Sequence, residues 1–109
     1  MNAIPKKLRA EMAADPEYKT CMRNALFNDH RCAADPMTGR LLEWEHALTW
    51  AGRQLQERFA IISICWWSHR GPGLDKRKNR IVAISRASDE DLAKYPNPEW
   101  PLLKKQIPA

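Results

Sequence analysis

Two short strand-like segments followed by a helix-forming segment constrain this chain more than any other feature. Residues 41–46 alternate roughly between apolar and polar side chains, which is typical of a short strand with two different faces. Residues 60–64 are rich in β-branched side chains and predict a second strand. Glycine and proline at 71–73 predict a loop, and helical spacing of apolar residues follows over 75–87. The pattern predicts a strand–strand–helix unit.

Helical and irregular segments are expected on both sides of this unit. Residues 5–27 predict an N-terminal helical segment, divided where Asp15 caps the second helix. The proline-rich residues 96–109 predict an extended tail. The predicted fold class is therefore α+β, with a core over 41–87 and one domain spanning residues 1–109.

Size and charge narrow the classes of function. A chain of 109 residues has room for one modest core, and its net charge of +5 suits contact with phosphate, although many small domains are mildly basic. The apolar run at 59–67 is too short to span a bilayer. The start of the chain lacks the pattern of a secretory signal, so we expect a cytoplasmic protein without a membrane partner. No sequence feature indicates a particular oligomeric state.

An acidic residue directly before a histidine ends the first predicted strand. The Glu45 carboxylate suits a divalent cation, and the His46 imidazole can accept a proton near neutral pH. The turn after the second strand brings in His69, a further ligand for the same cation. Considered without its surroundings, His46 is better interpreted as a half-buried histidine hydrogen-bonded at a strand end.

These residues together resemble the motif of the HNH (ββα-metal) endonuclease superfamily, and in particular short phage and prophage proteins of that group. The resemblance covers residues 21–87, with 14 residues from His46 to position 60 and 9 from there to His69. The matching segments are Trp44-Glu45-His46-Ala47, Ala60-Ile61-Ile62-Ser63-Ile64-Cys65, and Leu74-Asp75-Lys76 leading to Asn79.

The resemblance implies a metal-dependent endonuclease that hydrolyses phosphodiester bonds in DNA. In that reading His46 is the general base, and Glu45 and His69 hold the catalytic Mg²⁺, Mn²⁺ or transition-metal ion. The nucleic-acid contacts then fall on Arg70, Lys76, Asn79 and Arg80. The basic run that includes the last three residues is otherwise a solvated helix face.

Two positions depart from the family pattern. The middle asparagine, which braces the loop beside the base, is Ala60 here, and Gln56 or Glu57 are the nearby candidates for that role. Many members also hold a structural Zn²⁺ through four Cys or His ligands. Cys21, Cys32 and Cys65 match three of them, but the expected fourth position is Ser68, a poor zinc ligand. Either His30 takes its place or the site holds no zinc and the cysteines are free core thiols.

Two alternatives belong to other functional classes. A chain that keeps the fold but has lost catalysis would be a small binding protein that blocks a host factor, as a counter-defence or regulatory protein. A nucleic-acid-binding module without cleavage is the other. The chain has five tryptophans; we expect Trp44, Trp50 and Trp66 to pack in the core, and Trp67 and Trp100 to pack, stack on a base or meet a partner.

Overall fold

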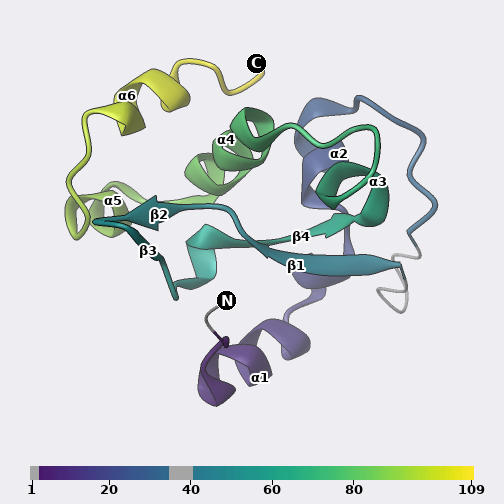
Figure 1. The fold of residues 1–109 in the computed structure, drawn as a ribbon, viewed down its shortest axis with the longest axis horizontal. Coiled ribbons are helices and arrows are strands. Elements are labelled where there is room, and N and C mark those ends of the chain that lie inside the picture. Colours follow the sequence, from purple (N-terminus) through teal and green to yellow (C-terminus); the bar gives the residue numbers. More distant parts are fainter. Residues whose placement is uncertain (1–2, 35–40) are drawn as a thin grey trace.

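A computed structural model describes residues 3–34 and 41–109 and has an α+β architecture, as predicted (Figure 1). Among the described residues, no helix combines the length and apolar character needed to cross a membrane. The elements in chain order are α1 (Lys6–Ala14), the 3₁₀ helix η1 (Pro16–Lys19), α2 (Met22–Phe27), β1 (Leu42–His46), β2 (Thr49–Trp50), β3 (Arg53–Gln54), the 3₁₀ helix η2 (Arg58–Ala60), β4 (Ile61–Cys65), α3 (Trp66–His69), α4 (Lys76–Arg86), α5 (Asp89–Ala93) and α6 (Glu99–Lys104).

The two predicted strands form an antiparallel pair, β1 with β4. The register places Leu42 opposite Cys65 and His46 opposite Ile61. A hydrogen bond of 2.8 Å from the backbone N–H of Ala47 to the carbonyl of Ala60 extends the pairing by one residue. All five residues of β4 are buried, whereas β1 is half-buried apart from one buried residue. In this two-stranded sheet β4 is therefore the strand inside the core, and β1 is the more exposed one.

A second, smaller sheet follows β1. Strands β2 and β3 pair antiparallel, and the two residues between them, Ala51 and Gly52, have φ angles of 52° and 78°. Two consecutive left-handed residues make the tight hairpin turn whose twist matches that of the strands. The hairpin returns the chain toward β4, and it sets the position of the segment that precedes η2.

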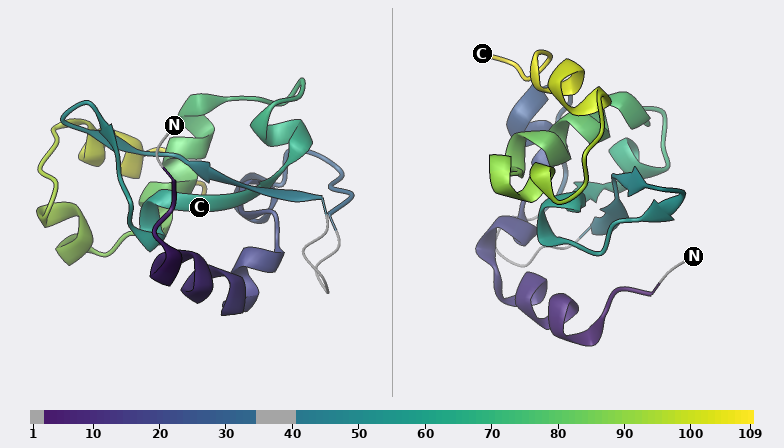
Figure 2. Two further views of the ribbon diagram at one scale, coloured as in Figure 1. Left: turned by 60° about the horizontal axis from the view of Figure 1, so that its bottom comes forward. Right: turned by 90° about the vertical axis from the view of Figure 1, so that its left-hand side faces the viewer.

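Helices cover the β1–β4 pair on both sides. Figures 1 and 2 show α1 on one side of the pair and α4 and α6 on the other. Fully buried side chains of β4, such as Ile62 and Ile64, share the core with Val82 and Ile84 of α4. The α4 helix begins as predicted, because the Asp75 side chain accepts a hydrogen bond from the third helical N–H at 3.0 Å.

The N-terminal segment forms the two predicted helical parts but contains an additional break. Asp15 caps the second part by accepting a hydrogen bond from the backbone of Glu17 at 2.9 Å. The helix stops at Thr20, whose hydroxyl donates to the Glu17 carbonyl and whose own carbonyl accepts from Ser63 Oγ at 2.7 Å. These bonds replace helical ones, so the chain turns and Cys21 becomes the N-cap of α2.

The predicted extended tail is wrong, because residues 99–104 form α6. Trp100 and Leu103 lie one turn apart and are buried, and Trp100 Nε1 donates to the Tyr95 carbonyl at 2.7 Å. Prolines at 98 and 101 occupy the N-cap and the first turn, where a helix needs no N–H donor. Burial of Trp100 and Leu103 therefore favours a helix here despite the proline-rich composition of the segment.

The exposure of the tryptophan side chains differs from the prediction. Trp50 and Trp66, expected in the core, are 36% and 52% exposed, whereas Trp100 is 5% exposed. Trp50 lies on the two-residue strand of the hairpin, and Trp66 is the first residue of α3, so neither faces the interior. Trp44 is half-buried and meets Tyr18 edge-on, with ring centroids 6.2 Å apart.

Candidate metal centres

Four donor side chains from three segments converge beside the C-terminal end of β4. Cys21 precedes α2, His30 and Cys32 follow it, and Cys65 ends β4. Their donor atoms all lie within 4.8 Å of one another, and Cys65 Sγ is 3.2 Å from His30 Nε2. The three cysteines are free thiols. Ligands around a tetrahedral Zn²⁺ are about 3.3–3.8 Å apart, so a contraction of about 1 Å would close this cluster around the ion.

The fourth member of the cluster is His30. The structure brings His30 beside the three thiols, the arrangement that one of the two possibilities left open by the sequence requires. The Ser68 side chain is fully buried, and its Oγ lies 3.5 Å from Cys65 Sγ as a hydrogen-bonding partner of that thiol. Three thiols and one imidazole are a donor set used by closed structural zinc sites.

The thiols differ in how readily they ionise. Burial opposes ionisation of Cys65, but hydrogen bonds from Ser68, His30 and Cys32 outweigh it and bring its pKa to about 7. Burial and the neighbouring thiols raise the pKa of Cys32 to about 12, and burial also raises that of Cys21. Clustered thiolates repel one another, so full ionisation of the cluster requires a cation among them.

Asp29 orients the imidazole of the cluster. Its Oδ1 lies 2.8 Å from His30 Nδ1, and Oδ2 accepts hydrogen bonds from Arg23 Nε at 2.9 Å and Lys78 Nζ at 3.2 Å. Burial opposes ionisation of Asp29, but these three partners outweigh it and lower its pKa to about 2. A carboxylate that accepts the Nδ1 proton leaves Nε2 as the ligand atom, the usual outer-shell arrangement around metal-binding histidines.

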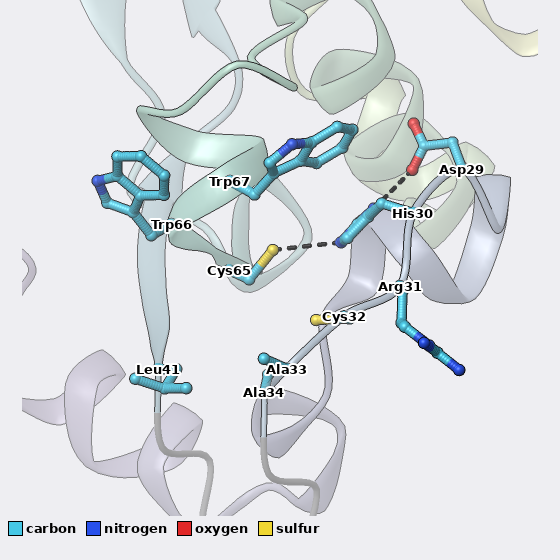
Figure 3. A pocket seen from close by; sticks show the side chains of 10 residues that line it. All are labelled: Asp29, His30, Arg31, Cys32, Ala33, Ala34, Leu41, Cys65, Trp66 and Trp67. Carbon is cyan, nitrogen blue, oxygen red and sulfur yellow. Dashed lines mark hydrogen bonds and ion pairs between the residues drawn. The ribbon is translucent and has the colours of Figure 1, made fainter.

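A pocket borders the cluster. It has a volume of about 550 Å³, and Figure 3 shows His30, Cys32 and Cys65 on its wall with Trp66 and Trp67 above them. The Trp67 ring stacks on His30, with centroids 4.4 Å apart and planes at 29°. This stacking covers one face of the imidazole and limits access of water to the cluster from that side.

A second group of ionisable side chains lies between β1 and α3. Glu43 and Glu45 share one face of β1 because side chains alternate along a strand. His69 Nδ1 is 2.7 Å from Glu43 Oε1, and His69 Nε2 is 3.9 Å from Glu45 Oε1. Since a carboxylate only accepts, Nδ1 carries a proton toward Glu43, and Nε2 is the ring nitrogen that faces Glu45. The structure thus brings together the two predicted ligands of a catalytic metal.

The Glu45 carboxylate is incompletely paired. Its side chain is 10% exposed, and Oε2 is buried without a hydrogen-bond partner among residues 3–34 and 41–109. Burial raises the pKa of Glu45, and the charges of His69 and Lys76 and the Asn79 amide offset this only in part. Glu43 differs: burial opposes its ionisation, but Arg70 and His69 outweigh it and lower its pKa. Of the two carboxylates, Glu45 is therefore the one whose charge is not balanced by hydrogen-bonding or ionic partners among the described residues.

His46 lies on the opposite face of β1 from Glu45. Its Nε2 is 3.0 Å from Gln56 Oε1, and the Gln56 amide nitrogen donates to the Ala3 carbonyl at 3.2 Å. This orientation of the amide makes Gln56 the acceptor, so His46 carries its proton on Nε2 and presents the Nδ1 lone pair. No hydrogen bond joins His46 to the Glu45–His69 pair within the part of the chain that the structure describes.

Main-chain contacts hold the loop around Ala60, which has no polar side chain of its own. The Ala60 carbonyl accepts from Ala47, the residue after His46. On the other side, Tyr18 Oη donates to the Ile61 carbonyl at 2.8 Å, and Arg86 donates to the carbonyls of Phe59 and Ile61 at 3.1 Å. Hydrogen bonds to main-chain carbonyls, from the Ala47 backbone and from the Tyr18 and Arg86 side chains, therefore brace this loop.

The basic residues expected at nucleic acid differ in exposure. Arg70 is 62% exposed and pairs with Glu43, and Lys76 is exposed at the start of α4. Arg80 pairs with Glu99 at 3.4 Å, and its Nε is buried. Asn79 differs most from expectation: it is 1% exposed and donates to the Ser68 carbonyl at 3.2 Å, so it acts inside the protein.

Sequence reasoning missed three residues of these centres. Glu43 and Asp29 each orient a histidine, and Arg23 contacts Asp29 from the interior. The adjacency of Asp29 to a histidine and the shared face of Glu43 and Glu45 were available signals. Nothing in the pattern around Arg23 indicated burial. Comparison of the chain with protein-family models, curated proteins and solved structures finds no match.

Proposed function

We propose that this protein is a metal-dependent endonuclease of the HNH type that hydrolyses phosphodiester bonds in DNA, as the resemblance to phage and prophage proteins implies. The observation that carries the proposal is the buried Oε2 of Glu45, which has no hydrogen-bond partner among the described residues, on a carboxylate whose Oε1 lies 3.9 Å from His69 Nε2. A buried carboxylate oxygen without a partner is unfavourable, and one cation would satisfy it.

The residues fit a hard divalent cation. Glu45 offers a carboxylate oxygen and His69 an imidazole nitrogen, and Glu43 fixes the ring of His69 from behind. Glu45 and His69 would hold the cation and leave it accessible to the phosphate of the substrate. When bound, the cation would supply Lewis-acid stabilisation of charge on the phosphate and on the leaving oxygen.

His46 is proposed to accept the proton of the attacking water at Nδ1. In an in-line displacement, the attacking and leaving oxygens lie on opposite sides of phosphorus. A phosphate at the end of β1 would therefore lie between His46 on one face and the Glu45–His69 pair on the other. Gln56 holds His46 in the tautomer that this role requires.

We further propose a structural Zn²⁺ in the cluster of Cys21, His30, Cys32 and Cys65. Three thiolates and the dication sum to one negative charge, and Asp29 adds a second beside them. The buried Arg23 guanidinium and the Lys78 ammonium both contact Asp29, so local charge is balanced when the cluster is loaded. The same balance is not reached with three neutral thiols.

DNA would be held through its phosphates. The net charge of +5, the exposed Lys76 and the exposed Arg70 favour backbone contact. Contacts of this kind set register and carry little sequence information, so we expect weak sequence preference.

The test is nicking of supercoiled plasmid by the full-length protein with Mg²⁺, Mn²⁺ or Ni²⁺. Glu45→Gln and His46→Ala should each lower the rate by at least about 100-fold. Glu90→Gln, which makes the same chemical change on an exposed residue of α5, should cleave as the wild type does. Equal nicking by wild type and Glu45→Gln would refute the metal site, and equal nicking by His46→Ala would remove that residue from the mechanism.

A second candidate function is a catalytically inactive binding protein that blocks a host factor. Two observations favour it: Ala60 has no polar side chain at the middle position of the motif, and Trp50 and Trp66 are exposed. This candidate predicts no divalent cation at Glu45 and His69, no nicking, and tight association with a host protein. A nucleic-acid-binding module without cleavage would instead bind DNA with an affinity that falls steeply with salt.

A further inference from the structure

A buried arginine lies between the two candidate metal centres. Arg23 is 2% exposed and donates from Nε to Asp29 Oδ2 at 2.9 Å, and its Nη2 lies 2.7 Å from the same oxygen as an ion pair. Its third nitrogen, Nη1, donates to Asn79 Oδ1 at 3.2 Å. The guanidinium also lies over the Trp67 ring, 5.8 Å from the centroid. A charge this deeply buried requires several partners, and here they belong to two different sites.

On one side the hydrogen bonds lead to the cysteine–histidine cluster. Asp29 accepts from Arg23 through one oxygen and from His30 Nδ1 through the other, and His30 Nε2 faces the thiols. Metal binding to Nε2 strengthens the Nδ1–H donor and holds the imidazole in place. The position of Asp29, and through it that of Arg23, therefore depends on the cluster.

On the other side the hydrogen bonds lead to α3 and the Glu45–His69 pair. Asn79 accepts from Arg23 and donates from Nδ2 to the carbonyl of Ser68, the residue before His69. Fixing the Asn79 amide thus fixes the backbone beside His69, one of the two proposed ligands.

We propose that Arg23 is a positioning residue that couples the two centres, so that metal in the cysteine–histidine cluster strengthens divalent-cation binding at Glu45 and His69. The proposal rests on the proposed function, which assigns a cation to that pair. The coupling is reciprocal, because linkage between two binding equilibria acts equally in both directions. Only an arginine provides a planar fork that can hold Asp29 and Asn79 at once, since a lysine has a single ammonium.

The experiment measures Mn²⁺ affinity of the zinc-loaded, full-length protein by calorimetry, together with Zn²⁺ affinity by competition with a chromophoric chelator. Asp29 contacts His30 and Arg23 but neither Glu45 nor His69. Asp29→Asn should nevertheless weaken Mn²⁺ binding by about 5-fold or more. The same substitution should have no further effect in an Arg23→Met background. A shift of equal size in both backgrounds would show that coupling does not pass through Arg23.

Lys78→Met is the matched control. Lys78 also donates to Asp29 but is 37% exposed and makes no side-chain hydrogen bond to Asn79 among the described residues. The Lys78→Met variant should bind Zn²⁺ modestly more weakly and keep the Mn²⁺ affinity of the wild type. Arg23→Lys replaces Arg23→Met if the latter does not fold. If neither folds, a loss of Mn²⁺ affinity in Asp29→Asn but not in Lys78→Met supports the coupling, and unchanged affinity in Asp29→Asn overturns it.

A second readout separates this proposal from the proposed function. The side-chain amide resonances of Asn79, recorded by NMR on zinc-loaded protein without Mn²⁺, should shift more in Asp29→Asn and in Arg23→Lys than in Lys78→Met, which changes the chain neighbour of Asn79 but none of its hydrogen bonds. If wild type binds no Mn²⁺ while these resonances shift, the proposed function fails and the hydrogen-bonded connection stands. If Mn²⁺ binds but the resonances and affinities do not respond, the connection fails alone.

Discussion

His30 and Asp29 are joined by a hydrogen bond of 2.8 Å from Nδ1 to Oδ1, which directs the opposite ring nitrogen of the histidine toward three thiols. The two residues are neighbours in the chain, and the turn after α2 allows both side chains to face inward. A loop histidine thereby becomes the fourth donor of a cluster whose cysteines come from distant segments. This pair also connects the cluster to the buried Arg23.

The purified protein should contain one zinc per chain. His30→Ala and Cys32→Ser should lose that zinc, whereas His46→Ala should retain it, because His46 is bonded to Gln56 away from the cluster. Removing zinc with a chelator should lower the free energy of unfolding by at least about 4 kcal/mol when free zinc had exceeded its dissociation constant 1,000-fold. Elemental analysis and chelator-dependent melting measure both effects. Full zinc content in His30→Ala would contradict the ligand assignment.

Glu45→Gln should stabilise the zinc-loaded protein at neutral pH when no other divalent cation is present. Burial raises the pKa of Glu45, so the folded state holds that proton more tightly than the unfolded chain does. The ionised carboxylate therefore destabilises the fold most fully above its folded-state pKa, and this penalty declines as pH falls below that pKa and is gone below the lower pKa of the unfolded chain. Urea unfolding at several pH values measures the difference between variant and wild type.

Added Mn²⁺ should reverse this order of stability. Wild type should gain stability because the cation satisfies Glu45 Oε2, and Glu45→Gln should not. Glu90→Gln, the exposed control, should follow wild type under both conditions. A Glu45→Gln protein that is less stable than wild type without Mn²⁺ would mean that the carboxylate is already satisfied in the folded chain.

Glu43→Gln should weaken Mn²⁺ binding by about 10–100-fold, because Glu43 holds the His69 ring in the orientation that presents Nε2. Arg70→Met is the control: Arg70 contacts the same carboxylate but is 62% exposed, so its loss should change Mn²⁺ affinity much less. Calorimetric titration of both variants compares them directly. Equal losses would indicate that charge, and not the orientation of His69, determines the affinity.

Gln56→Leu should slow plasmid nicking by about 10-fold or more without changing Mn²⁺ affinity, because it removes the acceptor that fixes the His46 tautomer. The ¹⁵N resonances of His46 should show a mixture of tautomers in this variant. Gln106→Leu makes the same change at an exposed position near the C-terminal end of α6 and should have no effect on nicking. Loss of Mn²⁺ affinity in Gln56→Leu would place this residue in the metal centre instead.

Trp100→Ala should destabilise the protein by about 3–5 kcal/mol, because it removes a nearly buried side chain from the core. Trp66→Ala should cost much less, because more than half of that side chain is exposed. Thermal or urea unfolding of the two variants tests whether α6 is part of the core. Similar stabilities would argue against the packing of α6 on α4.

Local signals in the sequence determined most of the secondary structure. Alternation over 41–46 and β-branched residues over 60–64 predicted β1 and β4, Asp15 predicted the start of the second N-terminal helix, and helical spacing over 75–87 predicted α4. These features depend on neighbours within a few residues, which is why the printed sequence contains them. The residue types of the site, such as an adjacent Glu45 and His46, were likewise visible without a structure.

Tertiary structure decided which of these side chains meet. The β1–β4 register and the break at Thr20 bring Cys21 beside Cys65, and only that approach selects His30 as the fourth donor. Arg23 is buried through contacts with residues such as Asn79, more than forty positions away. Trp100 is buried because the proline-rich segment around it forms a helix, which its composition did not predict. Convergence and burial are long-range properties because they depend on how whole elements pack, whereas caps and periodicity depend on a single turn of the chain.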